Sequence, residues 1–503
     1  MSLATINTQA LNGVTPLPVS VEVDISNGLP ALAIVGLPEA AVRESKDRVR
    51  AAIINSGFEF PARKITVNLA PADLPKEGGR YDLPIAIGIL AASQQIPDDQ
   101  LAQLEFHGEL ALSGELRAVS GALPIAIGAR DRNHTLILPH SDAQQARLIK
   151  DATVYQAQHL LEICQFLHQQ QMLQTPQLEL PTQRPWPPDL SDVKGQHRAK
   201  RALEIAAAGR HNLLMVGPPG TGKTMLASRL SGLLPPLSEQ QAIESAALRS
   251  ISHQGFDLAD WMQRPFRAPH HTASGVALVG GGSNPRPGEI SLAHHGVLFL
   301  DELTEFDRHT LDVLREPLET GRITISRAAR QAEFPASFQL IAAMNPCPQG
   351  YHCDGKALCH CTVEQQRKHR ARISAPLLDR IDIHIEVPAV DRALLTTSQQ
   401  HTGDNSEQVQ IRVNHAYQRQ LQRSDKANAQ LSSRETDEIC QLDAGCEKML
   451  DQAMQKLKLS ARAYHRILRM SRTIADLDDS EKITPAHLSE AIGYRSLDRL
   501  LGG

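Results

Sequence analysis

The sequence predicts an α/β protein made of three successive parts, and three observations carry this prediction. Residues 1–165 alternate between strand-like runs and apolar residues at helical spacing, which is typical of a mixed α/β domain. Residues 213–216 form an apolar run that leads into a glycine-rich loop and then into a helix-forming segment. Residues 405–503 are rich in charge and place apolar residues three and four positions apart, which indicates a final helical part.

The first part has a regular order of predicted elements. Residues 19–25 alternate apolar and polar as a strand does, meet the turn pair at residues 27–28 and continue into a second strand at residues 31–35. Residues 39–56 carry apolar residues at helical spacing, and this pattern stops at Gly57. Further patterns predict a strand at residues 65–69, an apolar helix at residues 82–92 and a hairpin around residues 113–114.

A proline-rich segment separates the first part from the second. Residues 181–188 hold four prolines and follow a glutamine-rich stretch, so they cannot continue a helix and form a semi-rigid spacer. The predicted organisation is therefore an N-terminal domain, a Gln/Pro-rich linker, a central domain with the glycine-rich loop and a C-terminal helical domain. Their expected bounds are residues 1–165, 166–190, 191–390 and 391–503.

Composition excludes several classes of protein. The net charge is only −4, so any contact with nucleic acid must use local basic patches. No basic residue precedes Arg43 and no long apolar run opens the chain, so we expect no secretory signal. The longest apolar stretch, residues 83–92, is too short to span a bilayer. Seven cysteines, four of them crowded between Cys347 and Cys361, do not resemble a disulfide framework. We therefore expect a soluble, cytoplasmic protein without membrane contacts.

The glycine-rich loop has the pattern of a phosphate-binding loop. Its glycines let backbone N–H groups close around phosphates, Lys223 supplies a positive charge and Thr224 offers a hydroxyl to Mg²⁺. The N-terminus of the following helix also faces the anion. A purely structural glycine turn is the alternative, and the strand before the loop and the helix after it argue against that. We therefore predict that a nucleoside triphosphate binds to Gly217, Pro218, Pro219, Gly220, Thr221, Gly222, Lys223 and Thr224.

Two carboxylates and an amide follow two further strand patterns of the central domain. Asp301 and Glu302 come directly after the apolar residues 296–300. We expect Asp301 to hold Mg²⁺, through water or together with Thr224, and Glu302 to polarise the attacking water. The second carboxylate distinguishes a hydrolase from a passive binder, since hydrolysis needs positioning and charge stabilisation. Asn345 ends another strand pattern and would align the water or the γ-phosphate; taken alone it would be a simple Asn-Pro turn.

Three arginines are candidate phosphate contacts. Arg380 lies within an apolar–polar alternation and is either an ordinary surface charge or a cation that reaches the γ-phosphate of a neighbouring subunit. Arg462 and Arg466 lie four residues apart at the start of a predicted helix, so they share one face of it.

With these motifs in place, the chain resembles AAA+ ATPases of the magnesium-chelatase-like clade and, more specifically, the YifB/ComM family. The resemblance covers essentially the whole chain and rests on residues 192–196, 199–208, 266–272, 285–293 and 377–382. It implies an N-terminal Lon-protease-like domain of the ribosomal S5 domain 2 type, an AAA+ αβα core and a C-terminal helical lid. It assigns Asn345 to sensor 1, Arg380 to the trans-acting arginine finger and Arg462 to sensor 2, with Arg466 as a competing candidate.

The resemblance also implies an activity. A finger donated across an interface implies a ring, and members of the family are homo-hexamers. They are ATP-driven helicases that promote branch migration and heteroduplex extension during natural transformation and recombination, on single-stranded or branched DNA, with recombination proteins as partners. Two alternatives stay open: a metal-insertion motor like magnesium chelatase, and a partner-dependent AAA+ ATPase that remodels proteins.

Two segments have functions that depend on this resemblance. In the N-terminal domain, the serine and lysine positions of active Lon-type proteases fall at about Arg80 and at Leu123, so we expect no protease chemistry and a structural collar instead. Within residues 266–290, small apolar residues and glycines suit a loop inserted toward a central pore, the alternative being a disordered surface loop. We expect His270 and His271 beside it to serve loop packing or substrate contact, because two adjacent side chains rarely share one metal ion.

A cysteine-rich finger is expected at residues 347–361. Four thiolates in a short polar loop can enclose a structural Zn²⁺, and the candidate ligands are Cys347, Cys353, Cys359 and Cys361. The spacing is not a paired CxxC pattern: Gln349 stands where family members often have a further cysteine, and His352 and His360 are substitute ligands. A loop of free thiols is the alternative. The densest basic stretch of the chain, residues 367–372, follows directly and is either a contact for a phosphodiester backbone or a solvated helix face.

Overall fold

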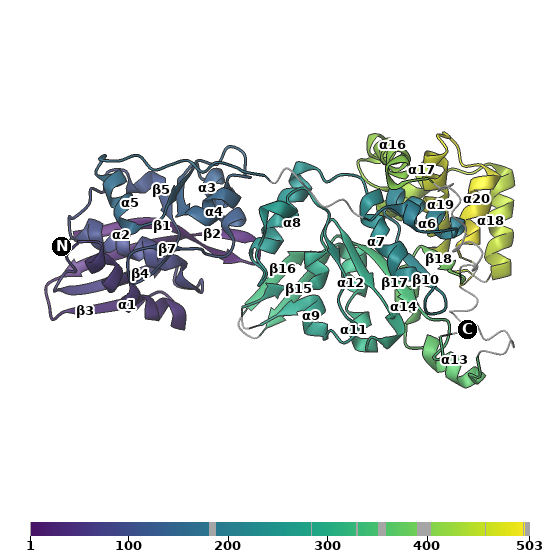
Figure 1. Cartoon of the computed structure of the whole chain (residues 1–503), viewed down its shortest axis with the longest axis horizontal. Helices are drawn as coiled ribbons and strands as arrows, with labels where there is room; N and C mark the ends of the chain where they lie inside the picture. Colours follow the sequence, from purple (N-terminus) through teal and green to yellow (C-terminus); the bar gives the residue numbers. More distant parts are fainter. Residues whose placement is uncertain are drawn as a thin grey trace. The chain divides into compact units, whose positions relative to one another are not determined.

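The chain divides into two compact units. The structure is a computed structural model and describes residues 2–180, 188–282, 284–327, 330–350, 359–389, 404–457, 459–495 and 497. One unit consists of Met1–Gln183 together with Ala242–Trp261, and the other of Arg184–Gln241 together with Met262–Gly503 (Figure 1). The segment 242–261 therefore leaves the expected central domain and belongs to the first unit.

The first unit is built on a seven-stranded mixed sheet, in the order β3-β4-β2-β1-β5-β8-β9. The strands are β1 (Ser2–Asn12), β2 (Thr15–Ser26), β3 (Ala31–Val35), β4 (Lys64–Ala70), β5 (Leu104–Phe106), β8 (Thr135–Pro139) and β9 (Val154–Ala157). β1, β2 and β4 pair antiparallel, and the other neighbours pair parallel. Alternate residues of β2 are buried, as its apolar–polar pattern predicts.

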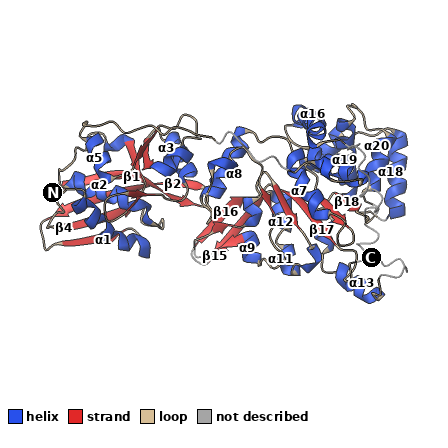
Figure 2. Cartoon of the chain, in the orientation of Figure 1, coloured by secondary structure: helices blue, strands red, loops and turns tan. Residues whose placement is uncertain are grey.

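Helices pack beside this sheet, as Figure 2 shows with helices in blue and strands in red. They are α1 (Ala40–Asn55), α2 (Asp82–Ala92), α3 (Ala122–Asp131), α4 (His140–Ala146) and α5 (Leu160–Leu167). α2 is buried along its whole length and packs against β1 and β2, which explains why its sequence is apolar on every face. A small hairpin joins β6 (Glu109–Leu110) and β7 (Leu116–Arg117). The strands and helices predicted in this part are confirmed.

The second unit is built on a parallel sheet of five strands in the order β11-β14-β17-β10-β18. The strands are β10 (Leu213–Val216), β11 (Phe266–Arg267), β14 (Val297–Leu300), β17 (Gln339–Met344) and β18 (Ile383–Glu386). Every residue of β10, β14 and β17 is buried, as expected of parallel strands. Counted along the chain, the strand order is 2-3-4-1-5, so the strand before the glycine-rich loop lies between the fourth and fifth strands.

Short elements connect these strands. They are α6 (His197–Gly209), α7 (Lys223–Leu233), α9 (Gly275–Val279), α10 (Glu289–Leu292), α11 (Arg308–Asp312), α12 (Arg315–Thr320), α13 (Val363–Arg370) and α14 (Ala375–Leu378). A further helix of this part of the chain, α8 (Glu239–Ser250), lies mostly in the segment assigned to the first unit. Two hairpins accompany them, β12 (Gly280–Gly281) with β13 (Arg286–Pro287) and β15 (Arg322–Arg327) with β16 (Arg330–Pro335). The described part of the 266–290 insertion thus holds a short helix and a two-stranded sheet. Gly280 is required there: it has φ +101°, and a Cβ would lie 2.1 Å from the Arg286 carbonyl oxygen.

The C-terminal part is helical, as predicted. Its helices are α16 (Ser406–Ser424), α17 (Ser433–Ile439), α18 (Ala444–Leu457), α19 (Ala461–Leu477) and α20 (Pro485–Gly493). Polar residues cap their N-termini; Asn405 and Ser432 form complete capping boxes with Gln408 and Glu435. These helices share one hydrophobic core with α6, α7 and the sheet. Among the described helices, none has both the length and the apolarity of a membrane span.

Candidate nucleotide site

Three neighbouring strands end at one edge of the parallel sheet. Val216 pairs with Met344, and Leu300 pairs with Ala342, so β10, β17 and β14 run side by side in the same direction. The residues that follow them are the glycine-rich loop, Asn345 and the Asp301–Glu302 pair. The carboxyl ends of parallel strands are where open α/β sheets bind ligands. The strand order therefore brings together three motifs that are far apart in sequence.

The glycine-rich loop is shaped around a buried cation. Gly220 and Gly222 take positive φ angles of 77° and 84°, and a Cβ at Gly217 would lie 2.2 Å from the Val387 carbonyl oxygen. Lys223 is 8% exposed, and its Nζ donates to the carbonyl oxygens of Gly217 at 2.7 Å and Pro218 at 2.8 Å. Burial lowers the pKa of Lys223. The ammonium is therefore held in a desolvated position, where it attracts an anion more strongly than in water.

Asn345 and Asp301 reach this loop from the two neighbouring strands. The Lys223 Nζ lies 3.3 Å from the Asn345 Oδ1. The Thr224 hydroxyl donates to the Asp301 Oδ2 at 2.5 Å, and the Asp301 Oδ1 accepts from the Glu302 N–H at 2.9 Å. A hydroxyl and a carboxylate in contact are the hard oxygen donors that Mg²⁺ takes, so these residues fit that ion.

Glu302 has an unusual backbone conformation, and its side chain contacts a histidine. Its φ of 49° is in the left-handed region, which few non-glycine residues occupy, and its side chain is 52% exposed. One carboxylate oxygen, Oε2, lies 3.0 Å from the Nδ1 of His271. The ring of His271 packs on that of His270, with 4.1 Å between the ring centroids. Loop packing or substrate contact was expected for this pair, and the contact with Glu302 was not, because it depends on β11 lying beside β14 in the sheet.

Arg380 bonds within its own chain. It is 8% exposed, and its guanidinium donates to the carbonyl oxygens of Pro376 at 2.6 Å and Arg315 at 3.2 Å. It also forms an ion pair with Glu319, at the end of α12. The described residues thus tie Arg380 to α12 and α14 and do not bring it to the glycine-rich loop of the same chain.

Arg462 and Arg466 have different surroundings on α19. The Arg466 Nη1 donates to the Asp382 Oδ1 at 2.6 Å, and both side chains are largely buried. Burial alone would raise the pKa of Asp382. The charge of Arg466, the nearby His211 ring and the Asn212 backbone N–H, which donates to the Asp382 Oδ2 at 3.0 Å, outweigh burial and hold this pKa well below its usual range. Arg462, one turn earlier, is exposed.

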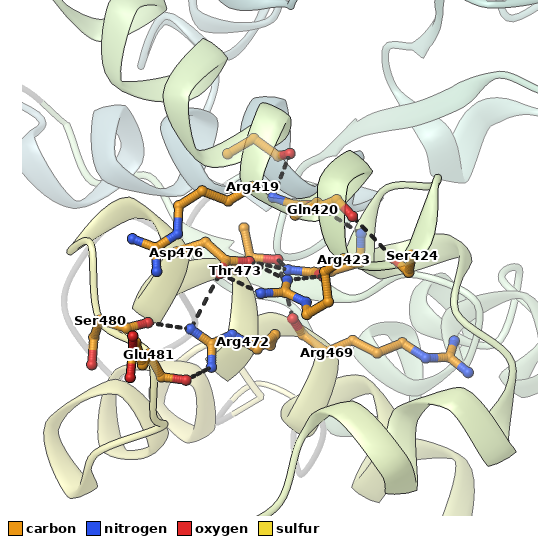
Figure 3. Close-up of polar contacts among 12 residues, drawn as sticks. Arg419, Gln420, Arg423, Ser424, Arg469, Arg472, Thr473, Asp476, Ser480 and Glu481 are labelled. Atoms are coloured by element: carbon orange, nitrogen blue, oxygen red, sulfur yellow. Dashed lines mark hydrogen bonds and ion pairs between the residues drawn. The ribbon is translucent and has the colours of Figure 1, made fainter.

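Further along α19, a buried polar network gathers around Thr473 and Asp476 (Figure 3). The His211 ring bridges Asp382, at 3.6 Å, and the Thr473 hydroxyl, at 2.8 Å. One turn further, Asp476 is fully buried and accepts two hydrogen bonds from Arg423 of α16, at 2.9 and 2.7 Å. Arg472 also lies 3.1 Å from Asp476. The network therefore joins the sheet, α16 and α19 into one connected set.

Three cysteines of the expected finger gather at one point. The Cys347 Sγ lies 3.4 Å from the Cys359 Sγ and 3.7 Å from the Cys361 Sγ. Sulfur ligands of one tetrahedral Zn²⁺ are about 3.8 Å apart when each Zn–S bond is about 2.3 Å, so the three thiols fit this ion. Cys353 and His352 lie outside the described residues. Among the described residues, His360 is not part of the group; its backbone N–H donates to the Gln349 side chain at 3.0 Å.

In the first unit, Arg80 and Leu123, which are expected at the serine and lysine positions of Lon-type proteases, offer no nucleophile. Arg80 donates to the backbone and side-chain oxygens of Ser120 at 3.2 and 3.3 Å. Leu123 is fully buried in α3. A buried carboxylate of β5 that no sequence pattern indicated, Glu105, accepts hydrogen bonds from Arg132 and Gln9.

Together, the parallel sheet in the 2-3-4-1-5 order and the phosphate-binding loop facing two carboxylates define a P-loop protein of the AAA+ class. Family models agree along the chain: magnesium chelatase subunit ChlI matches residues 189–395, subunit ChlI of Mg-chelatase matches 21–142, and the ChlI C-terminal model matches 403–495.

Comparison with known proteins shows the family within this class. The protein YifB of Salmonella typhimurium is 51% identical over 503 residues, which covers 100% of this chain and 98% of the relative. The competence protein ComM of Haemophilus influenzae is 50% identical over 509 residues, 100% of this chain and 99% of the relative. The magnesium-chelatase 38 kDa subunit of Cereibacter sphaeroides is 25% identical over 185 residues, 32% of this chain and 53% of the relative. The chain belongs to the YifB/ComM family of magnesium-chelatase-like AAA+ proteins.

Proposed function

We propose that the chain is an ATP hydrolase that works as a homo-hexameric DNA motor. The observation that carries the hydrolase assignment is the meeting of five side chains at one edge of the parallel sheet: Lys223, Thr224, Asp301, Glu302 and Asn345. The full-length likeness to a competence protein supports DNA as the substrate. The proposed activity is helicase-driven branch migration and heteroduplex extension on single-stranded or branched DNA in the cytoplasm, during natural transformation and recombination and with recombination proteins as partners.

The geometry supports a hydrolysis step in which each residue has one task. Backbone N–H groups of the loop and the Lys223 ammonium bind the β- and γ-phosphates. Thr224 and Asp301 would hold Mg²⁺, which neutralises phosphate charge when bound. Glu302 takes a proton from a water molecule as the water oxygen attacks the γ-phosphorus and the bond to the β–γ bridging oxygen breaks. Asn345 orients the water or the γ-phosphate beside Lys223.

Two arginines complete the proposed site. Arg380 acts in trans, on the γ-phosphate of the next subunit, after leaving its ion pair with Glu319. Arg462 acts as sensor 2, because its side chain is exposed whereas Arg466 is committed to Asp382. This assignment makes each site depend on two subunits and therefore on the ring.

The remaining parts have supporting roles in the proposal. The N-terminal domain is an inactive, Lon-protease-like collar that assembles the ring or guides DNA; ATP-dependent peptide hydrolysis by the purified protein would contradict this role. The 266–290 insertion faces the central pore, and the C-terminal helices form the lid. Cys347, Cys359 and Cys361 hold a structural Zn²⁺ with Cys353 as the fourth ligand. Metal analysis tests the zinc: about one ion per native subunit, and less in Cys359→Ser, is expected, whereas a metal-free native protein would refute it.

A branch-migration assay tests the proposed function. With ATP, the wild-type protein is expected to drive branch migration of three-strand and four-strand DNA junctions. It is also expected to hydrolyse ATP faster when DNA is present. Lys223→Ala removes the charge that binds phosphate and is expected to abolish both activities. Glu302→Gln keeps ATP binding and assembly but loses turnover. Absence of DNA binding and of DNA stimulation at low salt would reject the DNA motor in favour of metal insertion or protein remodelling.

A further inference from the structure

The basic stretch that follows the cysteine finger forms an exposed cationic helix. α13 and the turn after it hold four cations, Arg367, Lys368, Arg370 and Arg372, against one carboxylate, Glu364. Arg367, Lys368 and Arg372 are exposed. Lys368 pairs with Glu364 at 2.8 Å, but both side chains are about three-quarters exposed, and such pairs stabilise a protein little. The exposed side chains of Arg367 and Lys368 are therefore accessible to an anionic partner.

α13 has a defined start and a fixed position. Thr362 and Gln365 form a capping box, with hydrogen bonds of 3.2 and 2.9 Å between each side chain and the backbone of the other. A helix of eight residues is only marginally stable by itself in water. Contacts with the rest of the unit are therefore needed to keep α13 folded and in place. Figure 1 shows α13 at the edge of the second unit, away from the helices α16 to α20.

The contact that fixes α13 leads directly to the nucleotide site. His369, which is 6% exposed, has its Nε2 3.1 Å from the backbone oxygen of Asn345. Because a carbonyl oxygen can only accept, the Nε2–H of His369 donates this bond. Burial lowers the pKa of His369. Asn345 is the residue whose side-chain oxygen lies 3.3 Å from the Lys223 Nζ. One hydrogen bond thus separates the cationic helix from a residue that contacts the phosphate-binding lysine.

A second contact joins the same segment to the turn that carries Glu302. The Arg372 Nη1 donates to the backbone oxygen of Thr304 at 2.8 Å and lies 3.2 Å from both carboxylate oxygens of Glu305. Thr304 and Glu305 belong to the turn directly after Glu302. The segment therefore contacts the ends of both strands, β17 and β14, that supply the polar residues of the site.

We propose that α13 is a nucleic-acid-binding helix whose His369 and Arg372 transmit the contact to the hydrolysis site. The partner is a phosphodiester backbone, because residues 363–372 offer cations but no Phe, Tyr or Trp on which a base could stack, and the His369 ring is buried. Binding of DNA to Arg367 and Lys368 shifts α13, and the two bonds carry the shift to Asn345 and to the Glu302 turn. This inference rests on the proposed DNA motor and names the surface through which DNA regulates its ATPase.

The experiment compares ATP hydrolysis with and without DNA in full-length variants. Arg367→Ala/Lys368→Ala is expected to raise the DNA concentration for half-maximal stimulation about tenfold. The same variant should lower the salt slope of DNA binding by about 2, because two phosphates are no longer neutralised by the protein. Arg434→Ala removes a cation of α17 that is 90% exposed and serves as the matched control, with no change in either quantity.

The transmission step is tested at His369. His369→Ala is expected to bind DNA with wild-type affinity. Its stimulation ratio, the rate of ATP hydrolysis with DNA divided by the rate without DNA, should be at least about fivefold lower than in the wild type, since the bond to Asn345 is gone. His369→Gln keeps an N–H donor at a similar position and is expected to retain most of the ratio. If the wild type is stimulated but Arg367→Ala/Lys368→Ala and His369→Ala behave like it, the inference is wrong while the DNA motor stands.

Two other outcomes are distinguishable. If the wild type itself is not stimulated by DNA, the proposed function fails, whatever the variants do. If polyglutamate stimulates hydrolysis through Arg367 and Lys368 and DNA does not, the helix binds an acidic protein and the nucleic-acid assignment is overturned. Because Arg367 and Lys368 are exposed, their replacement tests the surface even if His369→Ala fails to fold.

Discussion

At the scale of single residues, proposed water activation depends on where the Glu302 carboxylate points. Its backbone is held in a left-handed turn with φ 49°, and His271 lies 3.0 Å from one carboxylate oxygen. A strained backbone at a reacting group persists only where its surroundings determine it. We therefore interpret His271 as a positioning residue that acts through Glu302.

His271→Ala is expected to lower kcat for ATP about tenfold and to leave KM for ATP within about twofold, because it misorients Glu302 without touching the phosphates. His271→Asn keeps a donor near the same place and should recover part of the rate. Steady-state ATP hydrolysis measures both constants. The matched control is His270→Ala, whose Nδ1 lies 2.9 Å from the Thr272 hydroxyl and not at Glu302. An equal loss in both alanine variants would mean that the loop, and not His271, holds the carboxylate.

The sequence predicts some of these residues and not others, for a physical reason. Lys223 and Thr224 follow from a local strand–loop–helix pattern, and Asp301 from a buried strand that ends in acids. The contacts of His271, His369 and Glu319 join segments far apart in the chain. They depend on strand order, which no local pattern encodes, so their partners become visible only in the fold.

At the scale of elements, α19 is tied to the core by buried charges and not only by apolar packing. Asp382, directly before β18, pairs with Arg466. Asp476 pairs with Arg423 of α16 (Figure 3). Buried ion pairs contribute little net stability, but removing one partner leaves a buried charge uncompensated. The pairs therefore fix where α19, with Arg462 at its start, sits against the sheet.

Asp476→Ala is expected to lower the free energy of unfolding by about 3 kcal/mol, because the buried Arg472 and the partly buried Arg423 would lose their carboxylate. Thermal unfolding should report a melting temperature several degrees lower for this variant. The control is Glu438→Ala, which removes an exposed pair with Arg434 at 2.9 Å and is expected to cost less than about 0.5 kcal/mol. Similar losses in the two variants would show that the Asp476 network is no more important than a surface pair.

At the scale of the whole molecule, most elements could be predicted from periodicity, but their grouping could not. The strands at residues 19–25 and 31–35 and the helix at 82–92 are found where their patterns predict them. The segment Ala242–Trp261 is assigned to the first unit, although it follows the phosphate-binding loop in sequence. Its backbone explains this: the Ser250 oxygen accepts from the Gly121 N–H at 3.0 Å, and the Phe256 oxygen from the Gln145 side chain. Periodicity identifies a buried helix face but not the surface that buries it.

The proposed ring predicts that two variants, each inactive alone, recover ATP hydrolysis when they assemble together. If Arg380 acts in trans, an Arg380→Ala subunit keeps a complete phosphate-binding loop but gives its neighbour no finger, and a Lys223→Ala subunit has the opposite defect. Each variant alone is expected to be inactive. In a head-to-tail ring assembled from equal amounts of both, about a quarter of the interfaces join an intact loop to an intact finger, so ATP hydrolysis should recover to about a quarter of the wild-type rate.

The rate is measured after co-assembly from dissociated subunits, with Lys223→Ala/Arg380→Ala mixed with wild type as the control for exchange. Recovery requires that one active site draws on two chains; mixtures that stay inactive although subunits exchange would place Arg380 in an internal structural role, held by Glu319.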